Sequence, residues 1–165
     1  MTLVIRGTAA FRKRVPDRSP AGGEALGALG EWFANVRLWR PHLAIFVHRE
    51  TYLPVLVDLA PASTVIVRFA EQMERVLLEL GVPADAVDRH RVDPTDARVE
   101  PTNDRSVVGV MNEYVKMLDW WRHDAGPITG DTAVRFSVEL AQTPVRAGSP
   151  SATWPDEAVH RLLAG

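Results

Sequence analysis

A polar stretch around position 105 carries side chains that could bind an anionic group. Arg105 offers a planar guanidinium whose fixed fork of N–H donors matches a carboxylate or a phosphate. Ser106 and Asn112 could add hydrogen bonds that orient such a group, and Gly109 leaves the backbone between them bare. If the stretch begins a helix, the free N–H groups of its first turn also favour negative charge. These residues predict recognition of an acidic or phosphorylated ligand through Arg105 and Asn112.

Gly109 also has a structural interpretation. A glycine inside a helix costs about 1 kcal/mol relative to alanine, so some feature of the protein should require it. Either a ligand or partner lies across Gly109, or another backbone of the same domain packs there while Asn112 bonds to a neighbouring strand or loop. Structural reasons for an internal glycine are common, which favours the packing interpretation.

A helix that begins near Arg105 would position these residues. Pro101 disfavours helix before it, and Asn103 or Asp104 can accept hydrogen bonds from the first N–H groups. Apolar residues then recur every three or four positions and predict the buried side of a helix over 105–122: Val107, Val110, Met111, Tyr114, Met117, Leu118 and Trp121. Arg105, Gly109, Asn112 and Lys116 share the opposite side. Trp120 lies at the border of the apolar stripe, where it could form a partner surface or be half-buried against the last helix.

Hydrophobic periodicity predicts an α+β fold for the whole chain. Apolar and polar residues alternate through 31–59, and turns at 40–41 and 48–51 divide this segment into a three-stranded antiparallel meander. Residues 15–30 are expected to form a loop. The other expected elements are a strand at 2–6, a helical turn at 8–14, helices at 64–80, 84–90, 131–142 and 155–163, and a strand at 97–100.

These elements predict a single globular domain over residues 1–165. We expect one antiparallel sheet, made of the meander 31–59, the N-terminal strand and the short strand near 97–100. The helices at 64–80 and 105–122 should pack on its apolar side. Met73 and Met111 lie in the middle of apolar stripes and are therefore expected in the core.

Composition excludes several classes of function. The 165 residues include no cysteine, which rules out a disulfide framework, thiol catalysis and a thiolate metal site. A formal net charge of −2 argues against nucleic-acid binding, although residues 12–14 and Arg18 form a small basic cluster. No apolar run reaches the roughly 18 residues of a membrane span, so we expect a cytoplasmic protein.

Motifs for metals, cofactors and catalysis are weak. Acidic residues and His90 gather over 85–96, but their spacing fits no calcium loop or zinc pattern, so we expect no metal. Phosphate-loop and dinucleotide fingerprints are absent from the sequence, and no cofactor is expected. Ser106 lacks the glycine elbow of a hydrolase nucleophile. Whether the protein is an enzyme stays open.

The sequence resembles a family of short bacterial proteins known as a domain of unknown function, whose central signature is Asn-Arg-Ser-x-x-Gly-x-Met-Asn. Residues 105–112 match this signature, with Asp104 in place of the asparagine. Similar features are Gly30-Glu31-Trp32-Phe33-Ala34-Asn35, the strand from Thr51 to Leu59, and Leu140-Ala141-Gln142-Thr143-Pro144, while His48-Arg49 replaces the usual Asn-Glu. The resemblance implies one unified domain and adds Trp32 and Asn35 to the residues of interest.

Two functions from different classes follow. The first is an interaction or regulatory module that binds a partner protein across Trp120 and Asn112. The alternative is a small-molecule enzyme or binding protein that grips an acidic or phosphorylated ligand with Arg105 while Asn112 orients it. The candidate binding residues are Arg105, Ser106, Gly109, Asn112, Trp120 and Asn35. The oligomeric state cannot be read from the sequence.

Overall fold

A computed structural model describes residues 2–18 and 26–165 of the chain. Its five strands are β1 (Thr2–Gly7), β2 (Leu26–Arg37), β3 (Leu43–His48), β4 (Pro54–Asp58) and β5 (Ala97–Pro101). The helices are α1 (Ala9–Arg14), α2 (Val65–Glu79), α3 (Ala84–Arg89), α4 (Arg105–Ala125), α5 (Gly130–Ala141) and α6 (Pro155–Leu163), and a 3₁₀ turn (Ala62–Thr64) precedes α2. In the described ranges, no helix is long and apolar enough to cross a membrane.

The strands form one mixed sheet in the order β4-β3-β2-β1-β5, which corrects the antiparallel sheet predicted from the sequence. The meander is present, since β2 pairs with β3 and β3 with β4 in antiparallel fashion. Strand β1, however, pairs in parallel with both β2 and β5. The expected loop over 15–30 is also partly wrong, because β2 begins at Leu26, while positions 19–25 of that loop lie outside the described residues.

The error has a physical origin in the connections between strands. Parallel neighbours need a crossover rather than a hairpin, and both crossovers are present in this chain. Helix α1 lies between β1 and β2 in the sequence. Helices α2 and α3 lie between β4 and β5, and they carry the chain to the far side of β1. Alternation of residue types reveals that a segment is a strand but does not fix the direction of its neighbour.

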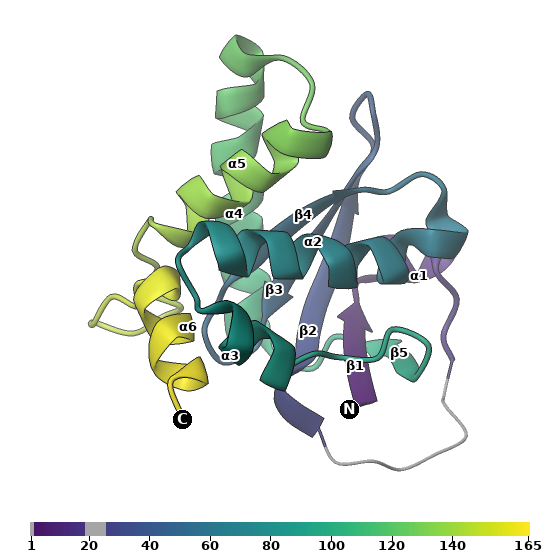
Figure 1. The fold of residues 1–165 in the computed structure, drawn as a ribbon. Coiled ribbons are helices and arrows are strands. Elements are labelled where there is room, and N and C mark those ends of the chain that lie inside the picture. Colours follow the sequence, from purple (N-terminus) through teal and green to yellow (C-terminus); the bar gives the residue numbers. More distant parts are fainter. Residues whose placement is uncertain (1, 19–25) are drawn as a thin grey trace.

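Helices cover both faces of the sheet, and not one apolar side as expected. Helix α2 lies in front of the sheet and α4 behind it (Figure 1). Trp32, Ala34 and Phe46 of the sheet face α2. They form one buried cluster with Phe69 and Met73 of that helix. The alternate residues point towards α4 and form a second cluster with Val110, Met111 and Tyr114: Phe33, Leu43, Ile45, Val47 and Leu56. Met73 and Met111 are buried, as the sequence predicted.

The outer edge of β4 is closed by helix side chains. Ser137 of α5 accepts a hydrogen bond on Oγ from the Leu56 backbone N–H at 2.9 Å. Gln72 of α2 donates from Nε2 to the Leu56 carbonyl at 3.2 Å. These side chains satisfy the backbone groups that an exposed edge strand would offer to another chain. These bonds oppose the addition of another strand to β4 at Leu56.

Candidate functional site: a groove along helix α4

Asp104 fixes the start of α4, as the sequence predicted. Its Oδ1 accepts hydrogen bonds from the backbone N–H groups of Ser106 at 2.9 Å and Val107 at 3.4 Å. This is the usual geometry of an aspartate N-cap. The cap also brings a negative charge to the helix N-terminus. The N–H groups of Ser106 and Val107 therefore bind Asp104 and are not free for an external anion.

A groove of about 660 Å³ runs along one side of α4. One wall consists of α4 residues from Arg105 to Met117, and the other wall is the segment 144–148 that follows α5. Val110, Tyr114 and Met117 give the α4 wall an apolar lining, whereas Arg105, Glu113 and Arg146 bring charge. We call this feature the α4 groove. Its volume falls within the range of roughly 300–1,000 Å³ that is common for ligand sites.

Gly109 lies in the wall of the α4 groove and faces open space. A Cβ atom built on it would meet no described heavy atom within 4 Å beyond its own helix turn. The interpretation in which a neighbouring backbone packs on Gly109 is therefore wrong for the described part of the chain. The missing side chain instead widens the groove at this position.

The two arginines of the groove lack acidic partners. Arg146 donates from Nη1 to the Pro150 carbonyl at 2.5 Å, and neither Arg105 nor Arg146 forms an ion pair with a described residue. By contrast, Arg6 and Arg49 both bind Glu31, at 2.5 and 2.8 Å. An arginine cannot lose its charge at neutral pH. Among the described residues, each wall therefore carries one arginine without an acidic partner.

The structure separates the candidate residues into two groups. Arg105, Ser106 and Gly109 line the α4 groove, but Asn112 and Trp120 do not. Asn112 lies about a third of a turn around α4 from Ser106 and is exposed. Trp120 is 76% exposed, so the predicted border position does not bury it. It lies further along α4, on the side of Gly109 and Glu113.

Asn35 has a separate environment near α1. Its Oδ1 accepts hydrogen bonds from the Thr8 hydroxyl at 2.7 Å and from the Val36 backbone N–H at 2.8 Å. Thr8 in turn caps α1 by accepting from the Phe11 N–H at 3.3 Å. Asn35 is thus joined to the connection between β1 and α1, and it does not line the groove.

An ion-pair network anchors the beginning of α4 to the sheet. Arg49 bonds to Glu31 and also reaches Asp104, at 3.7 Å between Nη2 and Oδ2. Burial alone would raise the pKa of Glu31, but hydrogen bonds from Arg6 and Arg49 outweigh it and lower the pKa below its ordinary value. Arg49 thus joins the turn after β3 both to β2 and to the start of α4.

The turn between β3 and β4 is hydrogen bonded to Tyr114, a residue that lines the groove. Tyr114 donates its hydroxyl to the Tyr52 carbonyl at 2.7 Å, and Tyr52 adopts a left-handed backbone conformation with φ of 62°. Buried His48 contacts Thr51 Oγ1 and the Ala28 carbonyl, both at 2.9 Å. Its Nδ1 also accepts from the Thr51 N–H, so Nε2 carries the proton. Burial lowers the pKa of His48 to about 4, which keeps the ring neutral.

Catalytic groups are not assembled around the groove. Asp104 accepts a hydrogen bond from the Ser106 backbone N–H, but among the residues with a described position no histidine or carboxylate bonds to the Ser106 hydroxyl, so a nucleophile–base pair is not formed there. The acidic segment 85–96 is used in other contacts: Asp85 binds Arg89, Asp88 binds Arg91, and Asp96 accepts from Thr2. Across the described ranges, no three histidine or acidic side chains group closely enough to hold a metal ion.

The second wall of the groove was not predicted from the sequence. Segment 144–148 is held by a bridge in which the backbones of Val145 and Thr153 exchange hydrogen bonds at 2.8 and 2.6 Å. Ala147 and Gly148 both have positive φ, of 47° and 78°. The available signal was the Gly148-Ser149-Pro150 turn, which marks a change of chain direction but not the element beside it.

Comparisons with known proteins identify the family of this chain. A profile described as "Domain of unknown function (DUF6933)" matches residues 4–158. No curated protein matches the chain, and no solved structure matches it. The match supports the predicted resemblance to a domain of unknown function, while the bacterial origin and the signature stay predictions. Because the matched region includes nearly all of the sequence, the chain belongs to the DUF6933 family.

Proposed function

We propose that the protein is an interaction module that binds an extended segment of a partner protein in the α4 groove. The observation that carries this proposal is Gly109. At this position a residue that weakens the helix leaves the groove wall open, and nothing described within the chain occupies the space. A site intended only for packing would bring another part of the protein against the glycine.

The composition of the groove supports a peptide-like occupant. Its lining is mainly apolar, from Val110, Met117 and Val145, and charged side chains stand at intervals along it. Exposed Trp120 continues the same side of α4 beyond Met117. Aromatic residues and arginine are enriched in protein interfaces, where they supply much of the binding energy. The proposed surface thus keeps Trp120 from the sequence hypothesis and moves its centre from Asn112 to Gly109.

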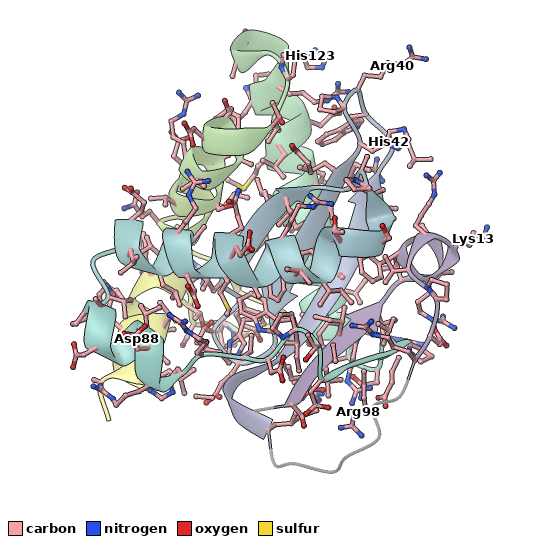
Figure 2. All side chains as sticks on the ribbon, turned by 45° about the vertical axis from the view of Figure 1, so that its right-hand side comes forward. Lys13, Arg40, His42, Asp88, Arg98 and His123 are labelled. Carbon is pink, nitrogen blue, oxygen red and sulfur yellow. The ribbon has the colours of Figure 1, made fainter. Side chains whose placement is uncertain are left out.

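Selection from a library of random linear peptides tests this proposal. Peptides selected on the full chain are measured again on Gly109→Leu and on His123→Leu. His123 also lies on α4 but near its far end (Figure 2), so leucine there controls for an added exposed apolar side chain. We expect Gly109→Leu to weaken binding by about tenfold or more, with His123→Leu unchanged. Equal binding to all three proteins, or no selected peptide, would contradict the proposal.

A second candidate is binding of a small acid or phosphate ester. Two arginines in opposite walls, neither with an acidic partner among the described residues, favour it, because guanidinium groups bind carboxylates and phosphates in a bidentate manner. Native mass spectrometry of the gently purified protein tests this alternative. A co-purified anion that is lost in both Arg105→Ala and Arg146→Ala would favour the small ligand over the partner segment.

A further inference from the structure

We propose, on the basis of the partner-binding function above, that the α4 groove selects a segment by the spacing of its charges. The preferred order is an acidic residue, an apolar residue two positions away and a basic residue four positions away. The structural basis is the arrangement of Arg105, Gly109, Glu113 and Met117 at intervals of four residues along one wall of the groove.

The acidic residue is set by the two arginines. Arg105 and Arg146 line the groove from different walls, and neither forms an ion pair with a described acidic residue. A carboxylate placed near Arg105 would find one or both guanidinium groups as partners. A basic residue at the same position would meet only positive charge.

The basic residue is set by Glu113. This side chain lines the groove, and its partner is Lys116 of the same helix, at 3.5 Å. Both side chains are largely exposed, so this pair holds Glu113 weakly and a charged ligand can compete for it. Glu113 follows Arg105 by eight residues, which corresponds to about 12 Å along the helix axis.

The repeat of the helix matches the repeat of an extended chain. Four residues of an α-helix advance by about 6 Å. Two residues of an extended chain advance by about 6.6 Å and return to the same side. Arg105, Gly109, Glu113 and Met117 form an i,i+4 row, which is inclined by about 26° to the helix axis. A segment lying along this row would therefore direct every second side chain towards it, in step with these four residues. The residue opposite Gly109 finds open space beside Val110, and the residue opposite Met117 finds an apolar contact.

Synthetic peptides of equal composition test this spacing. The first peptide has aspartate at position 1, leucine at 3, lysine at 5 and leucine at 7, with small polar residues between. Two others carry the lysine at position 4 or 6, and a fourth exchanges the lysine at position 5 with the leucine at position 7. Fluorescence anisotropy with the full chain should show binding by the first peptide about tenfold tighter than by the others. The reversed sequences are measured in parallel, because the segment can run in either direction along α4.

The spacing is tested most directly by a protein variant in which the acidic residue of the groove is moved along α4. In the double variant Glu113→Gln and Met117→Glu, the carboxylate moves one helical turn further from Arg105. The preferred lysine should then move two positions along the peptide, from four to six residues after the aspartate. A folding defect would reduce binding of all peptides together and cannot produce such a change of preference.

The outcomes separate this inference from the proposed function. If selected peptides bind in a Gly109-dependent manner but lysine position has no effect, the charge spacing is wrong and the binding function stands. An unchanged preference in the double variant would overturn the spacing as well. If neither selected nor designed peptides bind, both proposals fail.

Discussion

The two sides of helix α4 differ sharply in how their residues are used. On the side facing the sheet, Val107, Met111 and Leu118 are buried and belong to the same apolar cluster as Phe33 of β2 and Ile45 of β3. On the outer side, Arg105 is exposed and forms no ion pair with a described residue, and Gly109 faces open space. Residues only one or two positions apart in sequence therefore serve different purposes. The difference teaches that stability and binding can be altered separately within one helix.

Polar groups follow the same division. Beneath the helix, Tyr114 and His48 are buried, and each has hydrogen-bond partners. Burial raises the pKa of Tyr114 and lowers that of His48, so both side chains are uncharged at neutral pH. In the groove, Arg105 and Arg146 keep their charge without acidic partners among the described residues. A buried charge without a partner destabilises the fold, whereas a charge at an open groove stays hydrated and is available to a ligand.

The largest predicted effect belongs to the buried side. Met111→Ala should lower the free energy of unfolding by about 2–5 kcal/mol, because it deletes a fully buried side chain and leaves a cavity. Chemical denaturation measures the loss. Met117→Ala is the control on the groove side, where the side chain is only partly buried and the loss should be smaller. A loss for Met111→Ala below about 1 kcal/mol would mean that the helix faces are assigned wrongly.

The next effect concerns acid. His48 has an ordinary pKa of 6.5 that falls to about 4 in the folded protein. The fold therefore favours the neutral ring, and this stability is present above pH 6.5 and is lost as the pH falls from 6.5 towards 4. The fall in the pKa of His48 from 6.5 to about 4 corresponds to a loss of roughly 3 kcal/mol in the free energy of unfolding once the pH is below both values. Urea denaturation across this pH range should show the loss, and His48→Gln should flatten it. Identical pH dependence in the two proteins would contradict a neutral buried histidine.

A smaller loss is expected at the base of the groove. Tyr114→Phe removes the hydroxyl that bonds to the Tyr52 carbonyl, and should cost about 0.5–1.5 kcal/mol. Thermal unfolding followed by circular dichroism gives the change. Peptide binding should be preserved, because the aromatic ring still lines the groove. A loss of binding with unchanged stability would move Tyr114 from the scaffold to the binding site.

Gly109→Ala should change stability in the opposite direction. Alanine is the better helix former, and its methyl group meets open space, so the free energy of unfolding should rise by up to about 1 kcal/mol. Binding of a selected peptide should weaken at the same time. A fall in stability of about 1–3 kcal/mol would instead show that the methyl group overpacks against a neighbour.

The smallest effect on stability is expected for Arg105→Ala. The side chain is exposed and has no ion pair in the described structure, so the change should stay within about 0.5 kcal/mol. Peptide binding should nevertheless fall, and binding of acidic peptides should fall most. Arg49→Ala offers a contrast, since its ion pairs with Glu31 and Asp104 join the sheet to α4. A strong destabilisation by Arg105→Ala would make it a structural residue.

The elements of this fold were largely predictable from the sequence, but their arrangement was not. The apolar stripe of α4, a cap at Asn103 or Asp104 and the meander are local patterns. The structure confirms the meander, places Asp104 at the cap and buries most of the stripe, but Met117 and Trp121 are only partly buried. The parallel pairing of β1 with β2 and β5 depends on contacts between distant segments, which no local pattern encodes. The placement of α2 and α4 on opposite faces also depends on contacts between distant segments. Both alternate sets of residues in the central strands include apolar side chains, so the strand pattern does not say which helix covers which face.

The candidate site was predictable to the same extent. Arg105, Ser106 and Gly109 were identified because residues on one side of a helix are related by simple spacing. Arg146 was missed because it comes from a turn that reaches α4 only in three dimensions. Asn112 was grouped with Gly109 because the two are neighbours on the helix surface. The segment 144–148, however, lies against the other side of Gly109, so Asn112 does not line the groove. The site hypothesis thus depended on an element that the sequence could not position.

Mapping a bound peptide by backbone amide NMR tests the central claim most directly, namely that the outer side of α4 is the binding site. The full chain is labelled with ¹⁵N and titrated with a peptide selected on it. We predict that the largest shifts fall in residues 105–117 and 144–148, with small changes in α2, α3 and α6. Shifts centred on another surface, with the α4 groove unaffected, would contradict the account.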